Sequence, residues 1–493
     1  MNGPFDIAIV GGGVNGASIA RDAAGRGARV LLLEARDLAS GTSSASTKLV
    51  HGGLRYLEYH EFALVREALR EREVLWRIAP HIIRPMRFVL PHTPGLRPRW
   101  MLRLGLFLYD HIGGRRHLPP ASGIDLRRHP AGAALQQGIT RGFEYSDGWV
   151  DDARLVVLCA MDASERGAQI CTATPVSAAH RVDGQWRIET SAGQFHARAL
   201  VNAGGPGADD VARLAGAEPE WGIRRVRGSH IVTRRLFDHP YAYIFQLPDT
   251  RICFAIPYEG EFTLIGTTDR DHTGSLVEVA AGQDEIAYLR EAAGRYFRKA
   301  DGPDDVVWSY AGVRALVDDG SARPEAATRG YRISLSSAAQ GAPLMGIWGG
   351  KITSSRHVAQ EAVDRLAERL PQLHGQHWTA NAPLPGGDFA VDCLDDLVET
   401  LAASHPFLRD AEALRIARAY GTRAQRWLGR AKRREDLGRD FGCGLSEAEL
   451  EYMRSHEWAR TAEDALWRRS KLGLHLNPDQ QRAVALWFGQ NTA

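Results

Sequence analysis

The N-terminal region alternates short apolar runs with a glycine-rich turn and one alanine-rich stretch. The run from Asp6 to Val10 predicts a buried strand of a parallel sheet, and Ala17 to Arg26 predicts a helix. A second apolar run, Arg29 to Leu33, predicts the next strand. The order strand, turn, helix, strand is a βαβ unit, so we expect an α/β, Rossmann-like domain.

The pattern changes twice further along the chain. Ile252–Pro257 and Phe262–Thr267 alternate as strands of an antiparallel sheet, which suggests the floor of a substrate domain. Pro383–Gly387 has the composition of a linker, and the sequence beyond it is helical. The expected helices are Asp392–Ala402, Ala411–Leu428, Ser446–His456 and Thr461–Leu472. The expected parts are a discontinuous dinucleotide-binding domain (1–79, 147–207 and 330–382), a substrate domain (80–146 and 208–329) and a C-terminal all-α domain (388–493).

The composition is that of an ordinary globular protein of two or three domains, with 493 residues. The formal net charge of +2 does not favour nucleic acid as a partner. Five scattered cysteines without a CxxC pair favour a reducing compartment and argue against disulfides, zinc and iron–sulfur clusters. We find no signal peptide and no bilayer-spanning run, so we expect a cytoplasmic protein or one on the inner face of a membrane.

The turn Gly11–Gly16 carries a dinucleotide-binding fingerprint, with Asn15 within it. Gly11 permits the tight turn, Gly13 lets a pyrophosphate approach the backbone, and Gly16 lets the helix pack against the strand. The helix N-terminus points N–H groups at the phosphates. Glu34 ends the second strand, where a carboxylate would bind a ribose hydroxyl. The fingerprint alone does not separate FAD from NAD.

Two later segments favour FAD. Ala199–Gly205 is a strand running into a small-residue turn, and it resembles the second such turn of two-dinucleotide-type flavoproteins. Gly346–Thr353 precedes an amphipathic helix expected from Ser354 to Leu370. The N-terminus of that helix either faces the flavin and favours the negative charge of the reduced ring, or simply follows a turn on the surface.

The segment Gly41–Glu58 suits neither a helix nor a strand. It contains small hydroxyl residues, Lys48, His51, the glycine pair Gly52-Gly53, and Arg55. Because it follows the fingerprint closely, it can hold a cofactor on one side and a charged substrate on the other.

Together these motifs resemble a known family. The fingerprint, Gly41–Glu58, Tyr310–Leu316 and Gly349–Thr353 occur in the order found in FAD-dependent glycerol-3-phosphate dehydrogenases of the D-amino-acid-oxidase-like superfamily, and Glu457–Gly473 resembles their terminal domain. The resemblance covers essentially the whole chain, and the length suits the aerobic bacterial type. There are two departures: Ala45 stands where arginine is common, and Ala315 where proline is usual.

The resemblance implies that the chain oxidises sn-glycerol 3-phosphate to dihydroxyacetone phosphate. FAD would be bound tightly but not covalently, and electrons would pass to ubiquinone or another membrane quinone. The nearest alternative is a glycerophosphate oxidase that uses oxygen, which the length disfavours. A more distant one is an amine or amino-acid oxidase of the same fold. A catalytically silent flavin-binding or membrane-assembly protein is disfavoured because Arg55, Arg314, Lys351 and both histidines are retained.

The chemistry requires a proton acceptor and cations. His51 and His230 are even candidates for the base, since nearby cations favour a neutral imidazole. Arg314 is expected in catalysis and, with Arg55 and Lys351, in binding the phosphate. Tyr56 either adds a hydroxyl group to the substrate site or packs against its neighbours. The segment Thr267–Asp269 either borders the substrate cavity or is a plain strand-end turn, which is slightly favoured.

The residues expected at the cofactor share small side chains, hydroxyl groups or accessible backbone N–H groups. They are Gly11, Gly13, Asn15, Gly16, Glu34, Ser40, Thr42, Ser43, Ser44, Lys48, Leu49, Gly52, Gly53, Gly350, Lys351, Ile352 and Thr353. Some of the hydroxyls must stabilise turns instead. No metal is expected.

The segment Trp100–Tyr109 is apolar, too short to span a bilayer, and flanked by Arg97, Arg99, Arg115 and Arg116. The pattern alone favours a buried helix of the substrate domain. The resemblance favours the alternative, a peripheral contact with anionic lipid. The basic stretch Arg423–Arg434 is a second candidate contact, or a solvated helix face. A homodimer is a further possibility that the sequence leaves open.

Overall fold

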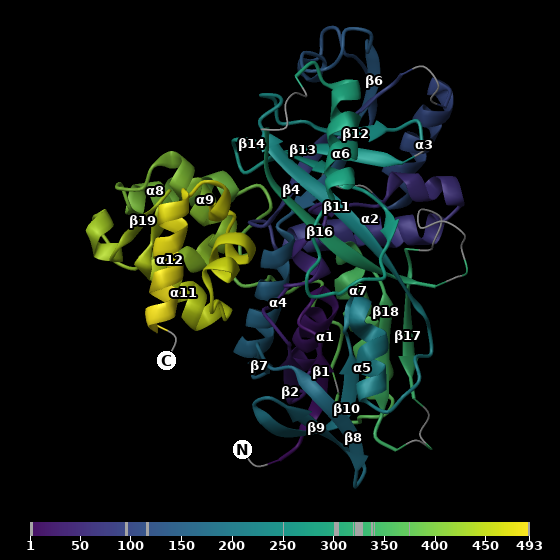
Figure 1. The fold of residues 1–493 in the computed structure, drawn as a ribbon, viewed down its shortest axis with the longest axis vertical. Helices are drawn as coiled ribbons and strands as arrows, with labels where there is room; N and C mark the ends of the chain where they lie inside the picture. Colours follow the sequence, from purple (N-terminus) through teal and green to yellow (C-terminus); the bar gives the residue numbers. More distant parts are fainter. Residues whose placement is uncertain are drawn as a thin grey trace.

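The computed structural model describes residues 3–93, 97–114, 118–249, 251–299, 305–318, 320, 329–336, 339, 341–373 and 375–491. Arg115 and Arg116, which were expected to flank the apolar segment, lie outside these ranges. Figure 1 shows two sheets stacked along the long axis of the molecule, with a helical C-terminal part beside α4.

The lower sheet in Figure 1 is built around β1 (Phe5–Val10), which pairs in parallel with β2 (Val30–Leu33) and β10 (Gly193–Asn202). Its main path is β17-β18-β10-β1-β2-β7, and β9 and β8 continue it from β10. The remaining bounds are β7 (Gln169–Cys171), β8 (Val176–Val182), β9 (Gln185–Thr190), β17 (Tyr331–Leu335) and β18 (Leu344–Gly349). The predicted Rossmann-like sheet is therefore confirmed.

Helices cover both faces of this sheet because successive residues of a strand point to opposite sides. Ile7 and Ile9 pack with α1 (Val14–Gly25), α4 (Asp152–Glu165) and α7 (Ser355–Ala367). Ala8 and Val10 face the other way, toward the side of α5 (Ala208–Leu214). The strong apolar bias of β1 follows from this burial on both faces.

The upper sheet has ten strands in the order β15-β11-β14-β13-β12-β4-β6-β3, with β16 added on β11 and β5 on β6. The predicted antiparallel strands are β13 (Ile252–Tyr258) and β14 (Phe262–Gly266), and they pair with each other as expected. The other bounds are β3 (Leu49–Val50), β4 (Ile83–Pro91), β5 (Ser122–Asp125), β6 (Arg141–Val150), β11 (Ile223–Arg234), β12 (Ala242–Gln246), β15 (Arg270–Asp271) and β16 (Val306–Val317).

Two helical layers enclose the upper sheet. Ile231 packs toward α6 (Gln283–Tyr296), and Val232 packs toward α2 (Phe62–Ile78) and α3 (Arg99–Ile112). Strand β6 carries residues 147–150 into this sheet, next to the predicted boundary at residue 147. The domain boundaries themselves stay a prediction.

The C-terminal part is helical, as predicted. Its helices are α8 (Leu394–Ser404), α9 (Asp410–Tyr420), α10 (Gln425–Leu428), α11 (Glu447–Glu457), the π-helix η10 (Asp464–Arg469) and α12 (Pro478–Asn491). The expected single helix Ala411–Leu428 is wrong, because Gly421 has φ 54° and interrupts it. The hairpin β19 (Asp440–Gly442) and β20 (Leu445–Ser446) was not expected.

Buried ion pairs join the C-terminal part to the first sheet. Arg469 is fully buried, and its guanidinium donates two hydrogen bonds of 2.6 and 2.7 Å to Asp37, just beyond β2. Arg154 of α4 donates to Glu457 at 2.6 Å. Trp467 of η10 stacks on Trp308 of β16, with ring centroids 4.5 Å apart. The helical part therefore contacts both sheets.

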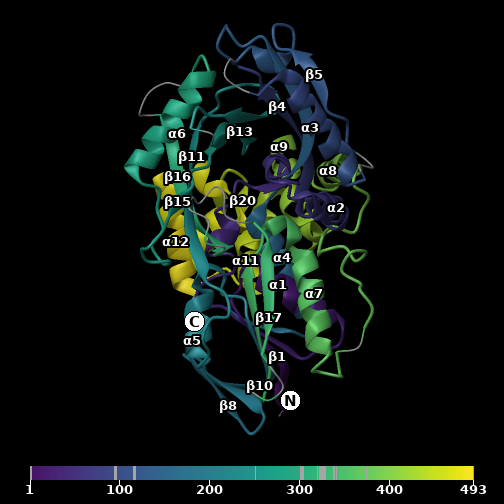
Figure 2. The same ribbon diagram turned by 90° about the vertical axis from the view of Figure 1, so that its right-hand side faces the viewer.

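Helix α3 confirms only half of the expectation of a buried helix. Helix α3 lies at the outer edge of the molecule (Figure 2). Leu106 and Tyr109 are buried, but other side chains of this helix form an exposed apolar surface. Its members are Trp100, Met101, Leu104, Phe107 and Leu108, which are 38–66 % exposed. No helix in the described ranges is both long and apolar enough to cross a bilayer.

Candidate active site

The glycine fingerprint folds as a tight turn between β1 and α1. Gly11 has φ +116°, and a Cβ on it would lie 2.5 Å from the Ala203 carbonyl oxygen. A Cβ on Gly16 would lie only 1.9 Å from the Gly11 oxygen. Ser43 reaches this turn from the following loop, where its Oγ accepts a hydrogen bond of 3.0 Å from the Val14 N–H. The start of α1 therefore offers backbone N–H groups and a hydroxyl to a phosphate.

Two polar side chains complete the rim of this turn. Glu34 accepts hydrogen bonds from the N–H groups of Gly12 (2.6 Å) and Arg36 (2.9 Å), while burial raises the pKa of its carboxyl. Asn15 donates to the Gly349 carbonyl at 3.3 Å, and its Oδ1 is buried without a hydrogen-bond partner. An incoming hydroxyl group would satisfy this buried acceptor, and the free N–H groups of the helix N-terminus would bind a phosphate, so a dinucleotide fits here.

The first half of the Gly41–Glu58 loop is held by the protein itself. Thr42 donates to the Val313 carbonyl at 2.5 Å, and Ser46 donates its hydroxyl to Asp152 at 2.7 Å. Lys48 is fully buried, and its ammonium lies 2.9 Å from Asp152 and 3.0 Å from the Ser44 carbonyl. The Lys48 side chain is thus occupied inside the protein, and its role at the cofactor stays a prediction.

The remaining predicted cofactor residues gather on two segments. Ser40, Leu49, Gly52 and Gly53 lie on the chain between β2 and η2 (Leu54–Tyr59). Gly350, Lys351, Ile352 and Thr353 form the turn into α7, and the Thr353 hydroxyl accepts a hydrogen bond from the His51 N–H at 3.3 Å. These two segments therefore meet at His51.

Arg314 of β16 lies across the sheet from the loop. Its guanidinium donates to the Thr267 hydroxyl at 2.8 Å and the Thr268 carbonyl at 3.2 Å, and it forms an ion pair with Asp269. A Cβ on Gly228 of the neighbouring β11 would come within 2.4 Å of the guanidinium, so a side chain there would displace Arg314. The segment Thr267–Asp269 borders this arginine, and its contact with the substrate stays a prediction.

Three cations surround Tyr56. The Lys351 ammonium lies 3.7 Å from the centre of the Tyr56 ring, and its Nζ is buried without a hydrogen bond. Burial opposes ionisation of Tyr56, but Lys351, Arg329 and Arg314 outweigh it and lower the pKa of the phenol. A Cβ on Gly53, which has φ +76°, would overlap this ring at 1.9 Å. These three cations, called the cation group below (Arg314, Arg329 and Lys351), offer positive charge of the kind that binds an anion.

Sequence reasoning missed Arg329. This residue lies 3.6 Å from Asp269, and one of its terminal guanidinium nitrogens is buried without a partner. No motif surrounds it, and its only signal is a basic residue directly before Gly330 and β17. Arg55 was predicted in this group; it lies half-buried beside Tyr56 on η2, and its contact with the substrate stays a prediction.

Both candidate histidines are held neutral. Burial, Lys351 and Arg72 lower the pKa of His51 to about 3. Burial, Arg314 and Lys48 hold the pKa of His230 well below its usual range. A neutral imidazole keeps a lone pair that can accept a proton.

The two histidines differ in their surroundings. His230 is 1 % exposed, lies 3.0 Å from the Thr47 hydroxyl and stacks on Tyr310 at 4.8 Å. His51 is half-buried and lies on the same loop as Tyr56, five residues before it. The choice between them as base stays a prediction.

Comparisons with known proteins agree with this geometry. Residues 6–356 match the family "FAD dependent oxidoreductase", and residues 377–486 match the "C-terminal domain of alpha-glycerophosphate oxidase". The chain is 50 % identical to a glycerol-3-phosphate dehydrogenase of Pseudomonas aeruginosa (97 % of this chain, 93 % of the relative) and 49 % identical to a D-erythritol 1-phosphate dehydrogenase of Brucella abortus (98 % and 97 %).

A solved structure gives the same picture. The glycerol-3-phosphate dehydrogenase of Bacillus halodurans, solved in complex with FAD, superimposes with a TM-score of 0.77 at 26 % identity, over 99 % of this chain and 91 % of that one. FAD is therefore the cofactor of this chain, as predicted. The chain belongs to the FAD-dependent oxidoreductase family and, within it, to the group of the FAD-dependent glycerol-3-phosphate dehydrogenases.

Proposed function

We propose that this enzyme oxidises the secondary hydroxyl of sn-glycerol 3-phosphate to give dihydroxyacetone phosphate. The observation that carries the proposal is the cation group of Arg314, Arg329 and Lys351 close to a neutral histidine on the flavin-side loop. Three cations match a phosphate dianion, and amine or amino-acid substrates lack that charge. The relatives named for phosphorylated polyols support the same substrate class.

Each group has a distinct task. Arg314, fixed by Thr267 and Asp269, presents its guanidinium to the phosphate, and Lys351 and Arg329 add positive charge. His51 or His230 accepts the hydroxyl proton as the carbon-bound hydrogen leaves with its electron pair. When bound, FAD supplies the hydride acceptor. Burial and the neighbouring cations disfavour the protonated form of both imidazoles, so each is neutral before the substrate proton arrives.

Anaerobic reduction of the bound flavin tests the proposal. We expect sn-glycerol 3-phosphate to bleach the visible absorbance of the purified holoenzyme, whereas glycerol and glycine do not. A quinone dye should then restore the absorbance, with little peroxide formed in air. Absence of bleaching by the phosphorylated substrate contradicts the proposed function, and stoichiometric peroxide indicates an oxidase instead.

D-erythritol 1-phosphate is a second candidate substrate, because a relative of equal similarity carries that name. Ala45 packs over Gly312, where an added Cβ would be 2.8 Å away, between Tyr310 and Arg314 on one face of β16. The contact between Ala45 and Gly312 is thus close, and a larger side chain at residue 45 displaces its neighbours on β16. Steady-state kcat/KM on both substrates decides, and Ala45→Leu should lower the value for erythritol phosphate more than that for glycerol phosphate.

The electron acceptor is a membrane quinone, and the enzyme reaches it by lying on the membrane through α3. The apolar surface of α3 (Trp100, Met101, Leu104, Phe107 and Leu108) is flanked by the exposed Arg99 and Arg103. An apolar stripe with arginines at its border suits an anionic lipid interface. The basic stretch Arg423–Arg434 is the weaker candidate for a lipid contact, because two of its arginines already form ion pairs within the protein. Arg423 pairs with Glu165, and Arg434 pairs with Glu412.

Vesicle flotation tests this surface. Replacing Trp100 and Phe107 together by serine should lower binding to anionic vesicles by about tenfold or more, since each buried aromatic contributes about 1.5–3 kcal/mol. Leu486→Ser is the matched control, because Leu486 is 66 % exposed on α12, away from this stripe. Unchanged binding of the double variant contradicts the assignment. A homodimer stays a prediction, and light scattering in detergent measures it.

A further inference from the structure

A buried chain of hydrogen bonds lies directly behind the loop that carries His51. Arg72 of α2 donates to Asp147 at 2.8 Å, and the Tyr109 hydroxyl of α3 donates to the same carboxylate at 2.8 Å. The Tyr109 oxygen in turn accepts a hydrogen bond from the Gly52 N–H at 2.8 Å. Tyr109 and Asp147 are each 2 % exposed and Arg72 is 6 % exposed, so water does not compete for these bonds.

The backbone at Gly52 is built for this contact. A Cβ on Gly52 would lie 2.7 Å from Leu69 and 2.8 Å from the Tyr109 oxygen, so only glycine lets the chain approach the hydroxyl. Gly52 is preceded by His51, and Gly53 supports the ring of Tyr56. A hydrogen bond that fixes the Gly52 N–H therefore fixes the backbone between two side chains of the candidate active site.

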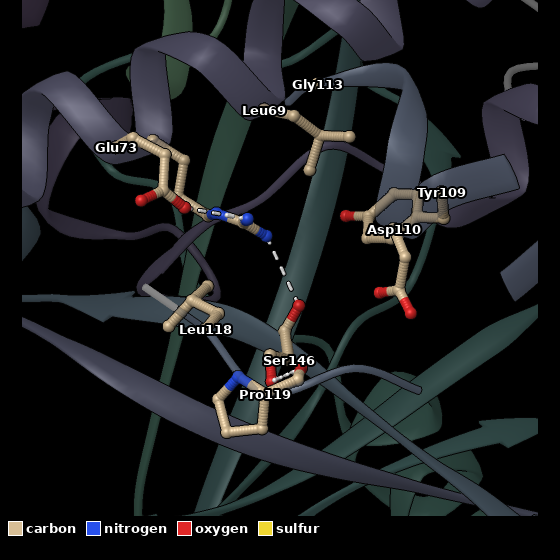
Figure 3. A pocket seen from close by; sticks show the side chains of 9 residues that line it. Leu69, Glu73, Tyr109, Asp110, Gly113, Leu118, Pro119 and Ser146 are labelled. Atoms are coloured by element: carbon tan, nitrogen blue, oxygen red, sulfur yellow. Dashed lines mark hydrogen bonds and ion pairs between the residues drawn. The ribbon is translucent and has the colours of Figure 1, made fainter. Parts of the chain in front are cut away.

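Tyr109 borders a small cavity between α2 and α3. Figure 3 shows its ring at the wall of this cavity, with Glu73 across from it, Leu69 above and Ser146 below. The cavity is about 10 Å³, the size of one water molecule. Packing therefore holds the ring, and the bonds to Asp147 and Gly52 fix the hydroxyl.

We propose that Tyr109 is a positioning residue for the reaction: its hydroxyl, anchored on the Arg72–Asp147 pair, holds the His51–Gly53 backbone in the productive place. The inference rests on the proposed function, since it concerns the rate of substrate oxidation. It assigns to Tyr109 no contact with substrate or flavin. In this proposal α3, whose outer face is the apolar surface, also fixes the position of the Gly41–Glu58 loop through the Tyr109 hydroxyl.

Tyr109→Phe tests the proposal, because it keeps the ring and removes only the hydroxyl. In anaerobic stopped-flow reduction, we expect the limiting rate of flavin reduction to fall about tenfold, as for the loss of one buried hydrogen bond. The substrate concentration at half-saturation should change by less than about twofold, because Arg314 and Lys351 lie on other elements. Flavin content should equal that of the wild type.

Tyr145→Phe is the matched control. Tyr145 is as buried as Tyr109 and meets its ring edge-on at 6.0 Å. Its limiting rate should equal that of the wild type. An equal fall in both variants, or no fall in Tyr109→Phe, overturns the proposal. A wild-type flavin that the substrate does not reduce instead overturns the proposed function, so the two failures are distinguishable.

The pH profile gives a readout that a purely structural role would not move. Burial raises the pKa of Asp147 to about 6, against the opposing effects of Arg72 and of the hydrogen bonds from Tyr109 and Gly52. The limiting rate of the wild type should therefore fall below about pH 6. In Tyr109→Phe this limb should move to higher pH, because the carboxylate has lost a donor; an unmoved limb contradicts the proposal.

The charged and titratable groups around Asp147 are Arg72 and Glu73 on α2, Tyr109 and Asp110 on α3, Tyr145 on β6, and His51 beyond Arg72.

Discussion

The two halves of the Gly41–Glu58 loop treat their polar groups in opposite ways. In the first half, Thr42, Ser46 and Lys48 direct their side chains to partners within the protein. In the second half, Tyr56 lies among cations, one of which, Lys351, has a buried ammonium without a hydrogen bond. Because buried polar groups are ordinarily paired, we expect a ligand on the side with the unpaired ammonium, and we call the paired side the scaffold.

The largest effect should come from the scaffold side. Lys48→Met removes one partner of a fully buried ion pair and leaves Asp152 charged, which should lower the free energy of unfolding by about 3–5 kcal/mol. Denaturant melts measure it. Lys432→Met, at an exposed lysine, should stay within about 0.5 kcal/mol. A loss of under about 1 kcal/mol for Lys48→Met would break the distinction between the halves.

The ligand side should respond in turnover instead. Arg314→Ala should lower kcat/KM by about 10²–10³-fold, because a charged donor to the phosphate is removed and Asp269 is left without its nearest partner. Flavin content should not change. Arg235→Ala, at an arginine paired with Asp238 on the surface, is the control. Loss of FAD from the Arg314 variant would show that this arginine belongs to the cofactor site.

His51→Gln sharpens the assignment of the base. If His51 accepts the proton, the limiting rate of flavin reduction should fall about 100-fold, whereas His230→Gln should have the smaller effect. The reverse order identifies His230 as the base. Rapid-mixing spectroscopy on both variants measures it.

The same variant has a signature in stability. His51 has a pKa of about 3 in the native protein and 6.5 in the unfolded chain. Between these pH values His51 is protonated only in the unfolded chain, so the free energy of unfolding of the wild type decreases as the pH falls through this range. His51→Gln should lose less over the same range. Parallel melts at pH 7 and pH 4 measure the difference, and equal losses would contradict the lowered pKa.

Tyr56→Phe should have the smallest effect. The ring that lies over Lys351 stays, and only a hydroxyl whose pKa the cations lower is removed. We expect KM to rise by about threefold to tenfold, as for one hydrogen bond to a charged group, with FAD and stability unaffected. A lower melting temperature with an unchanged KM would instead show that Tyr56 stabilises the fold and does not bind the substrate.

The sequence predicted those helices and strands whose formation depends on neighbouring residues in the chain. The β1–α1–β2 unit, the β13–β14 pair and the start of α11 at the Ser446 cap all follow from periodicity and turn chemistry. The interruption at Gly421 does not, because a Cβ there would lie 1.9 Å from the Gly386 oxygen, a contact made only in the folded chain.

The site divides in the same way. Gly11 and Glu34 belong to the dinucleotide fingerprint and His51 to the Gly41–Glu58 loop, whereas Arg329 comes beside Asp269 only in the folded chain. The apolar stripe of α3 was visible in the sequence, but periodicity says which residues share a face and not what covers it.

The bond between Asp37 and Arg469 has a consequence for biosynthesis. The two residues are 432 positions apart, and Asp37 opens the loop that runs into the flavin-side residues. A ribosome needs roughly 20 to 90 s to make that length of chain. Throughout that time, the nascent cofactor loop carries a carboxylate whose cation has not yet been translated. A chain that ends before η10 therefore lacks Arg469, the buried partner of Asp37. The segment that leads into the cofactor loop is thus fully paired only once the C-terminal part has been made.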